Sequence, residues 1–164
     1  MQLDTRLARV LHVLIHMQLR GGATTSDTIA QMLHTNPALV RRTMASLRGA
    51  GYVESERGPG GGWRLTCALA DVTVKDVYLA LAHKGVFTFG PAIDNPQCPV
   101  EAVVNAFVTT TQSAAEQALL DTMAETTLAN LAGRIAVPEV AAGHGVSRDF
   151  LPGRRGSGMN RCDT

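Results

Sequence analysis

Residues 36–65 read NPALVRRTMASLRGAGYVESERGPGGGWRL, and this stretch decides the fold of the chain. It opens on Asn36, a favoured helix N-cap, and on Pro37 at the first helical position, where the missing N–H costs nothing. The apolar residues that follow recur with helical spacing at Val40, Met44 and Leu47. Two glycines, Gly49 and Gly51, then supply a stop. The sequence predicts a short helix between these two signals.

A second short helix lies immediately before this one. Thr25 and Ser26 are good N-caps, and apolar residues continue to Leu33. Only residues 34–36 remain between the two helices, and so tight a connection is typical of a helix-turn-helix. Further upstream, the apolar spacing of residues 3–19 predicts another helix, which the Gly-Gly pair after it ends.

A β-hairpin is expected directly after the helix-turn-helix. Residues 52–57 alternate like a strand, residues 63–66 form a second strand, and the glycine-rich run 58–62 lies between them. Because this tip is longer than a two-residue turn, it should protrude as a wing. Residues 1–82 are therefore expected to form a winged helix-turn-helix DNA-binding domain, with its last helix at about Val74–Ala82.

The remainder of the chain predicts one long helix. No glycine and no further proline interrupts the helical pattern from Pro99 to Leu131. Near Thr111, consecutive β-branched residues mark the one place where we expect a kink or break. A helix of this length spans about 45 Å at about 1.5 Å per residue. Its apolar side would be partly bare in a monomer, because a domain of this size is narrower than that.

We therefore expect residues 99–136 to be a dimerisation helix that pairs with a second copy of the chain. Residues 83–98, which contain several Gly and Pro, read as a sensor-type loop, and the Gly- and Arg-rich residues 137–164 read as a flexible tail. The expected fold class is mostly α with a small β-wing. It combines a winged helix-turn-helix domain with a long C-terminal dimerisation helix.

The charge distribution favours a polyanionic partner for the first part of the chain. Residues 1–66 hold eight Arg and four acidic residues, a net charge of +4, whereas residues 67–132 hold two Lys and seven acidic residues, a net charge of −5. Residues 133–164 hold five Arg and three acidic residues, which returns the total to +1. The basic end is expected to meet double-stranded DNA.

The same composition argues against other classes of function. The chain has no apolar stretch long enough to span a membrane and no signal-peptide layout, so we expect a cytoplasmic protein with no membrane partner. It shows no nucleophile–base–acid set, so we expect no enzyme. His12 and His16 share a helical face but lack a third ligand, so we expect no metal site.

The residues expected to meet DNA lie on the second helix of the motif and on the wing. A helix in the major groove needs base-reading side chains near its N-terminus and cationic side chains that face phosphate. The candidates on the helix are Asn36, Ala38, Leu39, Arg41 and Arg42, and those on the wing are Arg57, Gly60, Gly61 and Arg64.

Plainer readings of these candidates stay open. Arg41 and Arg42 point about 100° apart, so one could read a guanine edge while the other takes a phosphate, or both could be solvated surface side chains. Arg57 could enter a narrow minor groove, or it could pair with Glu54 or Glu56. We expect Trp63 to pack on the domain rather than to stack on DNA.

The order of these features resembles a known family. The match comprises the first helix, the helix-turn-helix, Gly49-Ala50-Gly51-Tyr52-Val53 and the wing Arg57-Gly58-Pro59-Gly60-Gly61-Gly62-Trp63-Arg64-Leu65. Over residues 1–132 the chain is similar to the Rrf-two family of bacterial regulators, to which IscR and NsrR belong. The resemblance implies a transcriptional regulator, by expectation a repressor, that binds a partly palindromic operator as a homodimer. By position, Ala38, Leu39, Arg41 and Arg42 would lie on the recognition helix, and Arg57 would be the minor-groove residue of the wing.

The chain departs from this family at the loop before the long helix. Cluster-binding members carry three cysteines there, whereas residues 83–98 hold only Cys98, with His83 at the start and Glu101 three residues beyond Cys98. Iron–sulfur clusters are held mostly by several cysteine thiolates. Cys67 and Cys162 lie far away in sequence, so we expect no iron–sulfur cluster and no other cofactor.

Cys98, at the start of the long helix, is the candidate sensing residue. A thiol at a helix N-terminus can be reactive, so Cys98 could respond to a redox or electrophilic signal; the alternative is a small residue that caps the helix. Alternatively, we expect the regulator to sense a small-molecule effector.

The alternative function is a protein-interaction or ligand-sensing module that is regulated through a partner enzyme. Salt-sensitive binding to DNA would separate the two functions.

Overall fold

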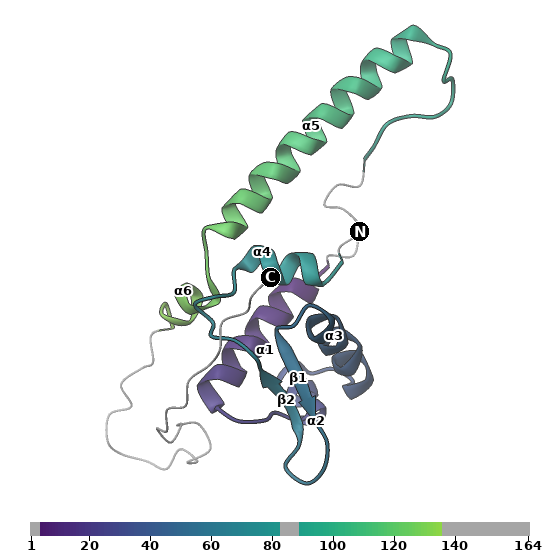
Figure 1. Ribbon diagram of the computed structural model, residues 1–164. Coiled ribbons are helices and arrows are strands. Elements are labelled where there is room, and N and C mark those ends of the chain that lie inside the picture. Colours follow the sequence, from purple (N-terminus) through teal and green to yellow (C-terminus); the bar gives the residue numbers. More distant parts are fainter. Residues whose placement is uncertain (1–3, 83–88, 136–164) are drawn as a thin grey trace.

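The computed structural model describes residues 4–82 and 89–135, and Figure 1 shows how they are arranged. Within these residues the elements follow in the order α1 (Arg6–Arg20), α2 (Ser26–Met32), α3 (Pro37–Gly49), β1 (Val53–Glu56), β2 (Gly62–Leu65), α4 (Val74–Ala80), α5 (Pro99–Ala124) and α6 (Leu128–Ala132). No helix among them is both long enough and apolar enough to cross a membrane. The expected mostly helical fold with a small β-wing is confirmed, and so is the long helix after it.

Side-chain caps define the helix-turn-helix, as the sequence predicts. The hydroxyl of Thr25 accepts a hydrogen bond from the backbone N–H of Thr28 at 3.1 Å and so begins α2. The side-chain oxygen of Asn36 accepts one from the N–H of Ala38 at 2.7 Å and begins α3, with Pro37 in its first turn. His34 makes the tight turn between the two helices with a φ of +48°.

The wing is a two-stranded antiparallel hairpin that is fixed to the start of α2. Strands β1 and β2 pair with Val53 opposite Leu65 and Ser55 opposite Trp63. Trp63 also exchanges two backbone hydrogen bonds with Thr24, of 2.8 and 2.9 Å, and its indole N–H donates to the Ser26 hydroxyl at 2.9 Å. Trp63 is 7% exposed, so the expectation that it packs on the domain is confirmed.

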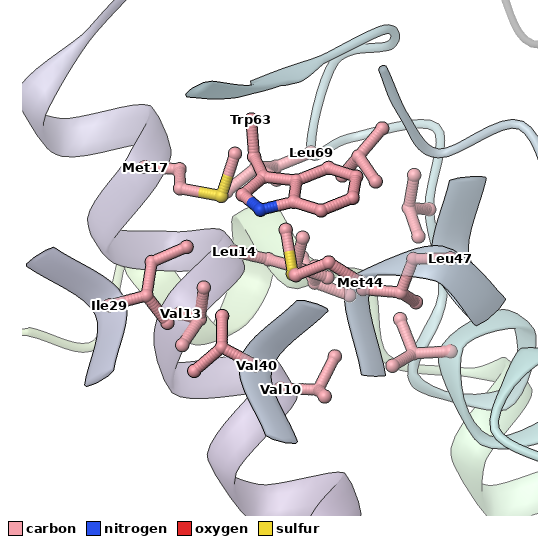
Figure 2. Close-up of a cluster of buried hydrophobic side chains, with 14 of the residues drawn as sticks. Val10, Val13, Leu14, Met17, Ile29, Val40, Met44, Leu47, Trp63 and Leu69 are labelled. Atoms are coloured by element: carbon pink, nitrogen blue, oxygen red, sulfur yellow. The ribbon is translucent and has the colours of Figure 1, made fainter. Parts of the chain in front are cut away.

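One hydrophobic core joins α1, α2, α3, the wing and the segments that follow it. Figure 2 shows the indole of Trp63 in this cluster with side chains of α1, α2 and α3 around it. The buried members include Val10, Val13, Leu14, Met17, Ile29, Val40, Met44, Leu47, Val53 and Leu69. Aliphatic and Met side chains dominate, as the low aromatic content of 4% requires. The core holds α3 and the wing in a fixed relation to each other.

The end of the long helix differs from the sequence prediction. We expected a helix from Pro99 to Leu131 with a kink or break near Thr111, but α5 runs unbroken past Thr111 and ends at Ala124. The helix propensity lost at each β-branched residue is only a fraction of a kcal/mol, about 0.5, which a long helix tolerates. The chain then turns, and a separate helix, α6, begins at Leu128.

Tertiary contacts explain why α6 separates from α5. Leu128 is fully buried in the core, and its N–H donates to the carbonyl of Val72 at 2.9 Å. Thr127 caps α6 through the N–H of Asn130, whose side chain in turn accepts from the N–H of Thr127. The core therefore draws this segment back toward α1, and a straight continuation of α5 would carry Leu128 into solvent.

Helix α5 projects away from the winged-helix body. The N-terminal end of α5 lies far from this body, and only its C-terminal end approaches α4 (Figure 1). No residue of α5 is buried in the single chain. The segment before it returns alongside α5, because Asn105 exchanges two hydrogen bonds of 2.8 Å with the backbone of Ala92 and Glu101 accepts one from the N–H of Asn95. The described part of the expected 83–98 loop, residues 89–98, is thus held against one side of α5.

Candidate nucleic-acid interface

Helix α3 presents a polar and cationic face opposite its buried face. Val40, Met44 and Leu47 are inserted in the core. Ala38, Arg41, Arg42 and Ala45 are exposed and lie on the remaining faces. Two small side chains beside two guanidinium groups allow the helix backbone to approach a groove closely while arginine reaches bases and phosphates.

Asn36 is engaged in the structure of the helix itself. Its side-chain oxygen is taken by the cap bond to Ala38, so its amide NH₂ group is what stays available to donate to DNA. The sequence prediction placed Asn36 among the DNA-contacting residues. The geometry adds a structural task, since the cap sets the direction in which α3 begins.

Leu39 faces away from Arg41 on α3, and Arg42, three residues after Leu39, lies on the adjoining side. It is 43% exposed and lines a pocket with Arg6 and Arg9 of α1 and Leu33 at the end of α2. Thr43, one turn further along α3, lines the same pocket. Leu39 was expected beside the arginines because it lies outside the buried stripe of α3.

Arg48 is a cationic residue that the sequence analysis did not select. It lies seven residues after Arg41, which puts both on the same face of α3, and its guanidinium donates to the hydroxyl of Ser55 on β1 at 3.2 Å. This bond joins the end of α3 to the wing. The seven-residue spacing of Arg41 and Arg48 is the signal that could have found it.

The wing tip exposes Arg57 and the glycines that follow it. Gly58 and Gly60 adopt positive φ values of +98° and +80°, and the N–H of Gly61 donates to the carbonyl of Gly58 at 2.9 Å, which closes the turn. Gly60 lies open to solvent, whereas a Cβ on Gly61 would lie 2.5 Å from the carbonyl oxygen of Glu56. Gly60 is therefore placed for close approach to a ligand, and Gly61 is required by the hairpin itself.

Arg64 is paired on the outer face of the wing. Its Nε and Nη2 donate to the two carboxylate oxygens of Glu56 at 2.8 and 2.9 Å. These bonds lower the pKa of Glu56 and raise that of Arg64, and the attraction between the two charges acts in the same direction. Of the pairings considered for the wing, Glu56 pairs with Arg64 and not with Arg57.

Besides Arg48, which is bonded to the Ser55 hydroxyl, three arginines at this surface lack an ionic partner within the described residues. Arg41, Arg42 and Arg57 are exposed, and none of them forms an ion pair with a residue in the described ranges. On the outer wing face, Glu54 and Glu56 outnumber Arg64, so that face is acidic. The positive potential of this region is therefore concentrated on α3 and the wing tip, where a phosphate backbone would meet it.

The candidate sensing and metal-binding residues do not converge in the described residues. Cys98 is half-buried at the N-cap of α5, with its N–H donating to the carbonyl of Asn95 at 2.9 Å. Cys67 is buried in the core between the wing and α4. The rings of His12 and His16 lie with centroids 4.6 Å apart and planes tilted by 57°, and the described residues contain no group of three or more potential metal ligands. His83 and Cys162 lie outside the described residues.

This donor set does not fit the thiolate cage of an iron–sulfur cluster. Residues 89–98 supply one thiol, and the second described thiol, Cys67, is enclosed by hydrophobic side chains. The described residues therefore offer a single accessible thiol.

Comparisons with known proteins agree with this geometry. Residues 3–134 match the Rrf2 family, which is described as an iron-dependent transcriptional regulator. The chain is 28% identical over 126 residues to the HTH-type transcriptional regulator YwnA of Bacillus subtilis, a match that covers 77% of this chain and 93% of YwnA. It is 43% identical over 61 residues to YwgB of the same organism, another HTH-type transcriptional regulator, over 37% of this chain and 39% of YwgB.

A solved structure shares the fold. The crystal structure of a transcriptional regulator from Lactobacillus plantarum superposes with a TM-score of 0.68 and 24% identity, over 80% of this chain and 89% of that one. The resemblance noted in the sequence is thereby confirmed, and so is the expectation of a regulator rather than an enzyme. The chain belongs to the Rrf2 family of transcriptional regulators.

Proposed function

We propose that this chain is a sequence-specific DNA-binding regulator that acts as a homodimer on a partly palindromic operator. One observation carries the proposal: Arg41, Arg42 and Arg57 are exposed and unpaired on two neighbouring elements that the core fixes in place. Arg41 and Arg42 supply the contacts of a recognition helix in a major groove, and Arg57 supplies a wing contact in the adjacent minor groove.

Helix α5 supports the homodimer. Four large apolar side chains in its N-terminal half are more than half exposed: Val100 68%, Val103 72%, Val104 52% and Phe107 71%. Spacings of three and four residues continue this stripe through Thr111, Ala114 and Ala118. Soluble proteins rarely leave such a stripe bare. The small side chains toward its end permit close approach of a second helix, so a second copy of α5 is the simplest cover.

Repression is the regulatory outcome that needs the fewest additional contacts. A dimer that occupies an operator excludes other proteins from the same DNA without any further binding surface.

We propose that the response to an effector does not require an iron–sulfur cluster, because the described residues supply one accessible thiol. Cys98 carries the redox part of this proposal: an oxidant such as diamide should change operator affinity in the parent but not in Cys98→Ser.

Binding of fluorescent duplex DNA by the full chain tests the central part of the proposal. Affinity should fall steeply as salt rises, because each phosphate contact releases bound counterions. An arginine that reads a base should, when changed to Ala, alter the preference between sequences. An arginine that contacts phosphate should instead weaken all duplexes alike and reduce the salt slope by about one.

Arg134→Ala is the matched control, because it removes one exposed arginine outside α3 and the wing. It should leave both affinity and sequence preference close to those of the parent. The proposal fails if Arg41→Ala, Arg42→Ala and Arg57→Ala bind every duplex as the control does.

A further inference from the structure

A pocket opens between α1, α2 and the first turns of α3, on the side of α3 away from Arg41. Six of its ten lining residues are aliphatic or Met. They are Val13, Ile29, Leu33, Leu39, Val40 and Met44. Leu39 is 43% exposed, so the pocket leaves apolar surface in contact with water. A ligand with an apolar part would gain free energy by displacing that water.

Arg9 gives the pocket a positive charge. Two arginines of α1 line it, and one of them, Arg6, is already bound by Asp4 through contacts of 2.6 to 3.1 Å. Arg6 also donates to the carbonyl of Leu81. Arg9 is exposed and forms no ion pair within the described residues. The pocket thus combines an apolar interior with one uncommitted guanidinium, which suits an anion that has an apolar tail.

The volume of the pocket sets the size of that tail. The pocket holds about 50 Å³, and a group the size of a water molecule needs about 10–15 Å³ on the same measure. A short alkyl tail of a few carbon atoms therefore suits the pocket. We propose that this pocket binds a short branched-chain carboxylate, with its alkyl tail beside Leu33 and Leu39 and its carboxylate on Arg9.

Such a ligand would act directly on the recognition helix. Leu39 and Thr43 belong to the first two turns of α3, the helix whose N-terminus Asn36 caps. Filling the pocket changes the packing of α3 against α1, and therefore the direction in which α3 presents Arg41 and Arg42. This regulatory consequence rests on the proposed function, whereas the binding site itself does not.

Methyl NMR of the full chain without DNA tests the site, with 3-methylbutanoate as the probe. The methyl resonances of Val13, Leu33 and Leu39 should shift and saturate on titration. Arg9→Gln should weaken binding about tenfold, the effect of losing about 1.4 kcal/mol from one charge-assisted contact. The uncharged 3-methylbutanamide should bind the parent about as weakly as 3-methylbutanoate binds Arg9→Gln.

Arg20→Gln is the matched control, because Arg20 ends the same helix and does not line the pocket. It should bind 3-methylbutanoate like the parent. The site is refuted by shifts that do not saturate, by equal affinity in Arg9→Gln, or by shifts that depend on protein concentration without ligand. The last result would mean that a second copy fills the pocket.

Duplex binding in the presence of 3-methylbutanoate tests the regulatory consequence. The ligand should change the Kd for DNA in the parent and in Arg20→Gln, but not in Arg9→Gln. An unchanged Kd despite saturable ligand binding would overturn the regulatory part. A chain that binds the carboxylate but no DNA would refute the proposed function while the site stands.

Discussion

At the scale of single residues, Gly62 shows how the wing is held against the helix-turn-helix. Its φ is +153°, and a Cβ placed there would lie 2.6 Å from the carbonyl oxygen of Thr24 and 2.7 Å from its carbon. The next residue, Trp63, exchanges backbone hydrogen bonds with Thr24 across this contact. The absence of a side chain at residue 62 is therefore what lets the wing strand pair with the chain before α2.

Gly62→Ala should destabilise the fold. The new methyl group meets backbone rather than a flexible side chain, and the strain at such a backbone angle adds to the clash, so we expect a loss of roughly 2–3 kcal/mol in the free energy of unfolding. Urea denaturation measures it. Gly49→Ala makes the same change where φ is not positive and nothing lies within 4 Å, and should be neutral or slightly stabilising. Equal effects of the two substitutions would contradict this account.

The Glu56–Arg64 pair predicts a dependence of stability on pH. Because Arg64 lowers the pKa of Glu56 in the folded chain, the pair stabilises the fold above the ordinary Glu value of 4.5. The contribution is lost as the pH falls through the lowered folded value. Unfolding curves should therefore show parent and Glu56→Gln converging in acid. Glu54→Gln should have the smaller effect at neutral pH. A difference between the parent and Glu56→Gln that does not shrink as the pH falls would count against the pair.

At the scale of secondary-structure elements, α3 is the part whose ends the sequence defines most sharply. Its cap and its first-turn proline are encoded by adjacent residues, Asn36 and Pro37, and both appear as expected. The capped helix matters for function because its first turns carry the exposed Ala38, Arg41 and Arg42.

Asn36→Ala should cost about 1 kcal/mol in the free energy of unfolding, because the N–H of Ala38 loses its partner. Thermal or urea unfolding measures the loss. Asn36→Asp keeps an acceptor at this position and adds favourable charge at the helix N-terminus, so it should retain most of the stability. A loss of similar size in both variants would show that the cap bond is not what Asn36 contributes.

The elements that the sequence predicts well are those with local signals. Caps, glycine stops and periodic apolar residues lie within a few positions of one another in α1, α2, α3 and the wing. The separation of α6 from α5 was not predicted, because the burial of Leu128 and its bond to Val72 join residues far apart in sequence. One local sign did exist: Thr127 and Asn130 have the three-residue spacing of a capping box.

The residue types of the candidate site could be predicted, but not their pairing. Arg57 and Arg64 both border the glycine tip in sequence, and either could meet Glu56. The strand register places Arg64 opposite Glu54 and diagonal to Glu56, within reach of long side chains. The strand register, which the sequence does not reveal, is therefore what makes Arg64 rather than Arg57 the partner of Glu56. Likewise, helix geometry rather than proximity in sequence separates Leu39 from Arg41.

At the scale of the whole molecule, the described chain is a folded body with an uncovered arm. Helices α1–α4 and α6 form the body and pack around one core, whereas the apolar stripe of α5 is exposed to solvent. A charge on that stripe should therefore disturb assembly far more than it disturbs folding.

Phe107→Asp should convert a dimer into a monomer. Light scattering after size exclusion should give the parent a mass near twice 17.4 kDa and the variant a mass near 17.4 kDa. Thr109→Asp is the control: it adds the same charge to an exposed position of α5 about 180° from the stripe, and it should stay dimeric. A parent that elutes as a monomer, or a dimer that survives Phe107→Asp, would argue against pairing through α5.

Selection of duplexes from a random library by the full chain tests the central claim most directly, with the Arg41→Ala, Arg42→Ala double variant run in parallel. The account predicts a two-fold symmetric motif whose half-sites lie about 10 base pairs apart, one helical turn. It also predicts that the double variant loses or changes the bases at the half-site positions. The same enriched motif in both proteins, or no enrichment in the parent, would contradict it.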